Sequence, residues 1–171
     1  MTLAGGLAAV EPGDALPVTN LSQLTTAFEG IVRAGSLSLY EGLPHPTAER
    51  ELFQREKNSQ EIVQFGGEPF YQTPLEVKPG DEELLRRFCS SAESFAVYSG
   101  PKRCGGFHAD YCLQWQEGDV KWQVLVCFGC QEVKFYGPDT ALRADVGPEV
   151  FKRLQALLGK YRAKRPDPQK A

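Results

Sequence analysis

Four of the five cysteines and one of the two histidines lie in a single stretch, from Cys104 to Tyr136. The stretch reads CGGFHADYCLQWQEGDVKWQVLVCFGCQEVKFY. Thiolates and imidazoles are the ligands that tetrahedral zinc prefers, and closely spaced cysteines also form disulfides or redox pairs. This stretch is therefore the candidate site, and the elements around it decide which of these side chains meet.

Alternation of apolar and polar residues predicts three strands here, because successive strand side chains point to opposite faces. Gly118-Asp119 and Phe128-Gly129 are predicted to be two-residue hairpin turns. They would pair Trp115 with Trp122 in the first hairpin and Val124 with Val133 in the second. A shift of one residue would turn the apolar set toward water, so we expect a well-defined register. The predicted buried set is Tyr111, Leu113, Trp115, Trp122, Val124, Val126, Val133 and Phe135.

This register gathers six side chains at one end of the sheet, on the face away from the core. Cys127 and Cys130 close the second turn, and Asp110 falls opposite Cys127. The full group is Cys104, His108, Asp110, Cys112, Cys127 and Cys130.

A structural zinc site is the first hypothesis for this group, because two thiolates from a Cys-x-x-Cys turn are common zinc ligands. The segment Cys127–Cys130, CFGC, resembles a zinc knuckle, the turn shared by zinc-ribbon and rubredoxin-like sites. It departs from that pattern at Gln131, where a glycine commonly follows. The preferred zinc ligands are Cys104, His108, Cys127 and Cys130, with Cys112 and Asp110 as substitutes.

Two other interpretations of the cysteines stay open. Cys127 and Cys130 could form a redox-active pair, but strand-like sequence follows them, whereas the thioredoxin-like motif opens a helix. Alternatively a disulfide, either Cys127–Cys130 or Cys104 to the hairpin, locks the sheet. Such a bond would favour an exported protein, and without it the cytoplasm is the default assignment. Five cysteines cannot all pair within one chain.

Composition limits the function further. The chain has 171 residues, 42% of them hydrophobic and 24% charged, which suits one globular domain. A net charge of −3 gives no reason to expect nucleic-acid binding. No apolar run approaches the ~18 residues of a transmembrane segment. We therefore expect a soluble binding or structural module rather than an enzyme, with a protein partner left open.

The remaining pattern predicts an α+β domain over residues 20–163, with helices on one face of a mainly antiparallel sheet that ends in a β-meander. Residues 1–19 read as a flexible leader and 164–171 as a flexible tail. Helices are expected over residues 20–33, 47–57, 79–90 and 149–162, and further strands over 36–40, 62–65, 70–77, 95–98 and 141–146.

His45 is the second histidine and lies between two prolines. Its backbone is therefore biased toward extended geometry. It is either a rigidly presented ligand or acid–base group, or part of an ordinary surface loop.

Overall fold

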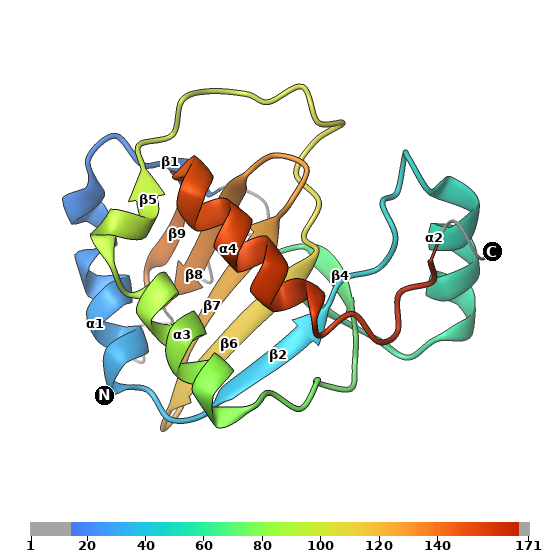
Figure 1. Ribbon diagram of the computed structural model, residues 1–171, viewed down its shortest axis with the longest axis horizontal. Helices are drawn as coiled ribbons and strands as arrows, with labels where there is room; N and C mark the ends of the chain where they lie inside the picture. The colour runs from blue at the N-terminus through green and yellow to red at the C-terminus, as the bar shows by residue number, and fades with distance from the viewer. Residues whose placement is uncertain (1–14, 168–171) are drawn as a thin grey trace, which may run out of the picture.

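A seven-stranded sheet is the frame of the computed structural model, which describes residues 15–167. Strands run in the order β1-β9-β8-β7-β6-β2, and β5 pairs with β9 (Figure 1). β1 and β9 are parallel, and the other pairs are antiparallel. The predicted α+β class and C-terminal meander are thereby confirmed. The strands are β1 Leu16–Pro17, β2 Leu37–Glu41, β5 Phe95–Ala96, β6 Tyr111–Glu117, β7 Val120–Cys127, β8 Glu132–Gly137 and β9 Thr140–Val146.

Three helices cover one face of this sheet. Each has an apolar stripe at helical spacing, and α3 and α4 begin with proline, whose missing N–H costs nothing at that position. They are α1 Thr25–Arg33, preceded by the short 3-10 turn Leu21–Leu24, α3 Pro79–Cys89 and α4 Pro148–Gly159. A second 3-10 turn, Ala92–Ser94, leads into β5. In the described range 15–167, no helix is both long and apolar enough to cross a membrane.

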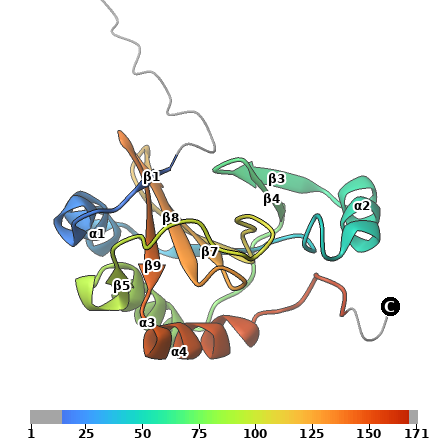
Figure 2. The same cartoon turned by 90° about the horizontal axis from the view of Figure 1, so that it is seen from above.

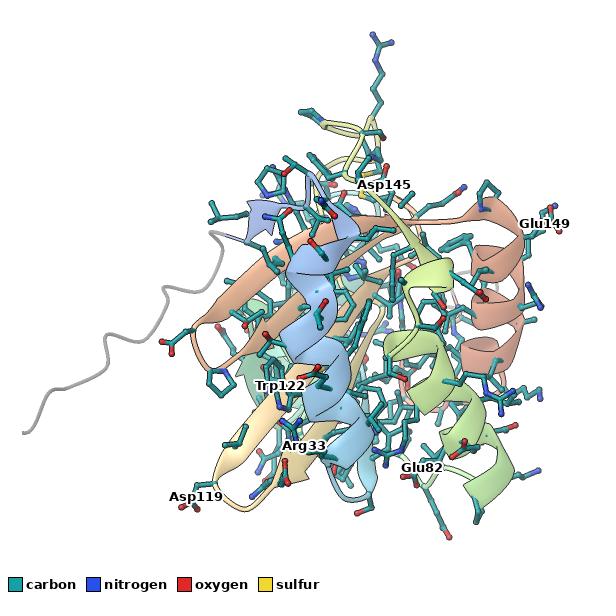
Figure 3. All side chains as sticks on the ribbon, turned by 90° about the vertical axis from the view of Figure 1, so that its left-hand side faces the viewer. Arg33, Glu82, Asp119, Trp122, Asp145 and Glu149 are labelled. Carbon is teal, nitrogen blue, oxygen red and sulfur yellow. A yellow bond between two sulfur atoms is a disulfide. The ribbon has the colours of Figure 1, made fainter. Side chains whose placement is uncertain are left out.

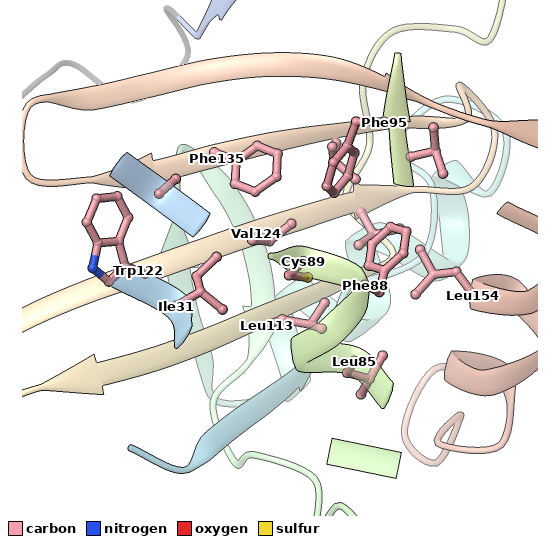
Figure 4. Packing of buried hydrophobic residues seen from close by; sticks show 14 of the residues in the cluster. Ile31, Leu85, Phe88, Cys89, Phe95, Leu113, Trp122, Val124, Phe135 and Leu154 are labelled. Carbon is pink, nitrogen blue, oxygen red and sulfur yellow. The ribbon is translucent and has the colours of Figure 1, made fainter. Parts of the chain in front are cut away.

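The main core lies between these helices and the sheet (Figure 4). Trp122 of β7 belongs to this core, and its indole packs against Gly30 of α1 and Gly137 of β8. The predicted buried set is found there: each of its eight members is at most 4% exposed.

The opposite face of the sheet is covered in part by a hairpin. β3, Ile62–Phe65, and β4, Glu68–Tyr71, lie across the sheet from α4 (Figure 2). Phe70 of this hairpin packs with Ala109, Cys112 and Leu125 in a second apolar cluster. The face away from the main core is therefore not a free surface for ligands near the middle of the sheet.

The predicted pairing register is correct for the first hairpin of the meander and wrong for the second. Trp115 pairs with Trp122, as predicted. In the second hairpin Val124 pairs with Phe135 and Val126 with Val133, so the predicted register is wrong by two residues. The connection is longer than a two-residue turn, with Gln131 in the left-handed region at φ 53°. A shift of two residues leaves every side chain on its predicted face, so the alternation could not detect it.

Both ends of the described chain are tied to the fold. Leu16 pairs with Leu142 inside the predicted leader 1–19, and residues 1–14 lie outside the described range. At the other end Glu41, the last residue of β2, accepts backbone N–H bonds from Ala163, Lys164 and Arg165. Residues 168–171 of the predicted tail lie outside the described range. This C-terminal segment runs beside α2, Arg50–Ser59, at one end of the molecule (Figures 1 and 2).

Candidate functional site

A disulfide is the covalent centre of the candidate site. Cys104 is bonded to Cys130, which lies 26 positions further along the chain, and their Cα atoms are 5.5 Å apart. Cys104 lies in loop 97–110, which has no helix or strand, and Cys130 lies in the turn between β7 and β8. The bond therefore joins an irregular loop to the meander. Cys130 is buried, whereas Cys104 is partly exposed and can be reached from solvent.

Cys127 is a free thiol beside this bond. Its Sγ lies 3.3 Å from the backbone nitrogen of Cys130, which donates a hydrogen bond to it, and the N–H of His108 donates another. Burial outweighs both donors and raises the pKa of the Cys127 thiol. In the oxidised protein this thiol is therefore protonated at neutral pH and a poor nucleophile. The predicted Cys127–Cys130 pair is not bonded in the structure, because Cys104 takes Cys130 as its partner.

His108 and Asp110 lie next to the same turn, but their side chains form hydrogen bonds with backbone groups. Nε2 of His108 donates to the carbonyl oxygen of Leu43 at 2.8 Å. Asp110 accepts the N–H of Phe128 at 2.7 Å and so holds the start of the CFGC turn. Burial lowers the pKa of His108, although Asp110, with its Oδ1 3.8 Å from Nδ1, raises it in part.

Arg165 joins this group from the far end of the chain. Its guanidinium contacts Oδ1 of Asp110 and Oε2 of Glu49, each at 2.6 Å. Burial tends to raise the pKa of Glu49, but hydrogen bonds from the His45 N–H and from Arg165 outweigh burial and lower it. Sequence reasoning placed Arg165 in a tail and missed this role, because no local pattern marks a residue whose partners are 55 and 116 positions away.

His45 lies beside this network. Its Nδ1 accepts backbone N–H groups of Thr47 and Ala48, so the proton of a neutral ring sits on Nε2. The His45 and His108 rings are 4.9 Å apart between centroids. Gly105 passes over the His45 ring with a φ of 83°, a conformation that glycine adopts without strain. His45 is thus partly buried and packs against Gly105 and His108 of loop 97–110. Whether it also acts as a ligand or an acid–base group stays a prediction.

The predicted zinc ligands are only partly brought together. Cys104, Cys127 and Cys130 meet at one turn, but Cys104 and Cys130 are bonded to each other and the His108 ring faces Leu43. Across residues 15–167, no group of three or more His, Cys, Asp or Glu side chains is placed to hold a metal ion. Zinc binding therefore stays a prediction that concerns the reduced chain.

Cys112, the predicted substitute, lies apart from this group. It is fully buried beneath Phe70 in the second apolar cluster, and burial raises the pKa of its thiol well above the ordinary value. Cys89 of α3 is equally buried, in the main core. Both thiols are packing residues, as is usual for free cysteines.

A pocket of about 460 Å³ opens on the other side of the disulfide. Both bonded cysteines line it, together with Lys102, Arg103 and Asp145. Nζ of Lys102 is 2.8 Å from Oδ1 of Asp145, and this ion pair holds loop 97–110 to β9. Asp145 of β9 is labelled in Figure 3. The disulfide therefore forms part of the wall of a cavity that a small molecule could enter.

Comparison of the chain with protein-family models, with curated proteins and with solved structures found no match.

Proposed function

We propose that this protein is a binding module rather than an enzyme, and that Cys104–Cys130 is a reversible bond controlling the position of loop 97–110. The observation that carries the proposal is the bond itself, which joins the loop to the β7–β8 turn. Reduction by a dithiol would leave two thiols at Cys104 and Cys130 and convert the reductant to its own disulfide. The loop would then be held by Lys102 and noncovalent packing.

The accessibility of the bond supports a reversible role over a purely structural one. Cys104 is partly exposed, and both bonded cysteines line a pocket. A thiolate must approach a disulfide sulfur directly to exchange with it, so access controls the rate. If the bond persists in the cell, the protein belongs in an oxidising compartment.

The polar groups near the disulfide are engaged in structural contacts, which favours a binding module over an enzyme. His108, Asp110 and Arg165 could act as acid, base or cation, but each is committed to a structural partner. Their arrangement holds three segments together: loop 42–49, loop 97–110 and the segment 163–165. Such a platform is suited to presenting a loop to a ligand or a protein partner.

We also propose zinc as a ligand of the reduced chain. Reduction would release the Cys104 and Cys130 thiols next to that of Cys127, giving three sulfur ligands at one turn. His108 follows Cys104 closely and would be the fourth ligand only if its ring left Leu43. A native mass spectrum of reduced protein mixed with zinc should show one added zinc, lost on chelation. A reduced, folded protein that takes up no zinc rules out this part of the proposal.

Limited proteolysis tests the control of the loop. Trypsin cuts after Lys102 and Arg103, inside the loop that the disulfide holds. We expect cleavage there to be about tenfold faster after reduction with a neutral dithiol, because cleavage follows the population of the opened loop. Reoxidation should restore protection. Cleavage after Lys121, in the meander, is the internal control and should not change.

The same experiment can contradict the proposal in two ways. The bond could resist the dithiol until the whole protein unfolds, or cleavage after Arg103 could be equally slow with and without the bond. Either result would make Cys104–Cys130 a static cross-link.

A further inference from the structure

The pocket beside the disulfide carries one uncompensated positive charge. Lys102 is neutralised by Asp145 at 2.8 Å, and it also donates to Ser99. Arg103 lines the same pocket, and within residues 15–167 its guanidinium makes no hydrogen bond or ion pair. Among the charged residues that line the pocket, Arg103 is therefore the one without a counter-ion.

The size and chemistry of the pocket define a ligand class. A volume of about 460 Å³ lies within the range of small-molecule sites, roughly 300–1,000 Å³. A guanidinium binds carboxylates through two parallel hydrogen bonds, which a point charge cannot do. The Cys104–Cys130 bond also lines the pocket, and the natural reaction partner of a disulfide is a thiol.

We propose that this pocket binds a small thiol bearing one or more carboxylates, with the carboxylate at Arg103 and the sulfur directed at Cys104. The proposal rests on the reversible disulfide proposed above and names its reductant. Lys102, Val146 at the end of β9 and Gly147, which precedes α4, also line the pocket.

The order of the exchange follows from the different exposure of the two cysteines. The thiol loses its proton to solvent, and the thiolate attacks Sγ of Cys104, which is the more exposed of the pair. A bond forms between the ligand sulfur and Cys104, the Cys104–Cys130 bond breaks, and Cys130 leaves as a thiolate that takes a proton. A second thiol then attacks the ligand sulfur. It releases Cys104 as a thiol and leaves the ligand as its own symmetrical disulfide.

Three monothiols of different charge test this assignment: mercaptoacetate, 2-mercaptoethanol and cysteamine. Each rate of opening is divided by the rate of the same thiol with a neutral small disulfide, which removes differences in thiol reactivity. We expect mercaptoacetate to exceed 2-mercaptoethanol by roughly fivefold, the factor for one charge pair at about 4 Å in water. Cysteamine should be the slowest. The preference should fade as the salt concentration rises toward 1 M.

Arg103→Gln should bring the three normalised rates together, and Arg103→Glu should reverse their order. Arg153→Gln is the matched control, because Arg153 is an exposed arginine of α4 that lies in a different groove. It should keep the preference of the original chain. Peptide mass mapping of the trapped intermediate should place the mercaptoacetate adduct on Cys104.

The outcomes separate this proposal from the function on which it rests. If a neutral dithiol opens the bond in the folded protein but the normalised rates are equal, the anionic-thiol site is wrong and the reversible bond stands. The anionic-thiol site is also wrong if Arg103→Glu leaves the order of the rates unchanged or if the adduct lies on Cys130. If no thiol opens the bond without unfolding, the reversible bond itself is wrong.

Discussion

At the scale of single residues, Trp122 shows how closely the main core is packed. Its indole lies against the backbone of Gly30 in α1 and of Gly137 in β8. A β-carbon at either glycine would overlap ring atoms of Trp122. These glycines are therefore required by the close approach of a helix and a strand to one large side chain, although the backbone angles of Gly30 are ordinary for a helix.

Gly30→Ala should therefore destabilise the protein. Overpacking a core costs roughly 1–3 kcal/mol, more than the up to about 1 kcal/mol that alanine gains in helix propensity. We expect a net loss of about 1–2 kcal/mol in the free energy of unfolding, measured by urea denaturation. Gly80→Ala is the matched control, since nothing lies within 4 Å of its added carbon in α3. An equal stability of the two variants would show that Trp122 can move aside.

His108 should make stability depend on pH between about 5 and 7. Burial lowers its pKa below the ordinary value near 6.5, so the unfolded chain binds the proton more readily than the folded one. Neutral His108 therefore makes its full contribution to the free energy of unfolding above pH 6.5. This contribution decreases as the pH falls below that value.

His108→Gln should flatten this dependence. Glutamine can still donate to the carbonyl of Leu43 but does not titrate. The measurement is the unfolding free energy of both proteins at several pH values from 5 to 7. Glu68 and Glu132, whose pKa values burial raises, are present in both proteins and cancel in the comparison. A variant with the full slope of the original chain would assign the pH dependence to other groups.

At the scale of elements, the C-terminal segment after α4 acts as a clamp on two loops. Glu41 binds the backbone of residues 163–165, and Arg165 then reaches Asp110 and Glu49. The side chain of Arg165 is 15% exposed, and those of Asp110 and Glu49 are 10% and 16% exposed. An ion pair so shielded from water is costly to break on one side, because the other charges stay buried.

Arg165→Ala should lower the free energy of unfolding by about 3 kcal/mol, since it leaves the buried carboxylate of Asp110 and the partly buried one of Glu49 without their cation. The control is Lys152→Ala, which removes an ion pair whose partners are 71% and 79% exposed. That pair should contribute less than about 0.5 kcal/mol. Chemical denaturation measures both changes. Similar losses in the two variants would mean that the clamp contributes no more than a surface contact.

At the scale of the whole molecule, the disulfide closes a chain segment that contains β6 and β7. Cross-linking two residues 26 positions apart restricts the unfolded chain by about 3.5 kcal/mol in the chain-entropy account. The same bond thus stabilises the fold and, in the function proposed above, holds a loop in place.

The double variant Cys104→Ser/Cys130→Ser should therefore unfold about 3.5 kcal/mol more easily than the oxidised protein. Reduced protein of the original sequence should match the double variant. Adding reductant to the variant should change nothing, which controls for effects on Cys89, Cys112 and Cys127. If reduction and substitution leave the unfolding free energy unchanged, the unfolded chain is already compact across this segment.

The sequence by itself determined the class of fold, the strands of the meander and the face that each strand buries. Alternation has a period of two, so Trp122, Val124 and Phe135 could be assigned to the core without any knowledge of their partners. The same period explains the error in the second hairpin, because a shift of two residues preserves every face.

Tertiary structure decided which functional groups meet. Cys104 could reach the second hairpin only once loop 97–110 was placed, so its bond to Cys130, one of two pairings open in the sequence, depended on that placement. Cys112 belongs to the predicted cluster by register, but the β3–β4 hairpin covers it. Arg165 lies far along the chain from Asp110 and Glu49, and no periodic signal links them. The periodicity of a sequence indicates which face of each strand is buried. Contacts between distant loops depend on the tertiary packing of the whole chain, which no local pattern encodes.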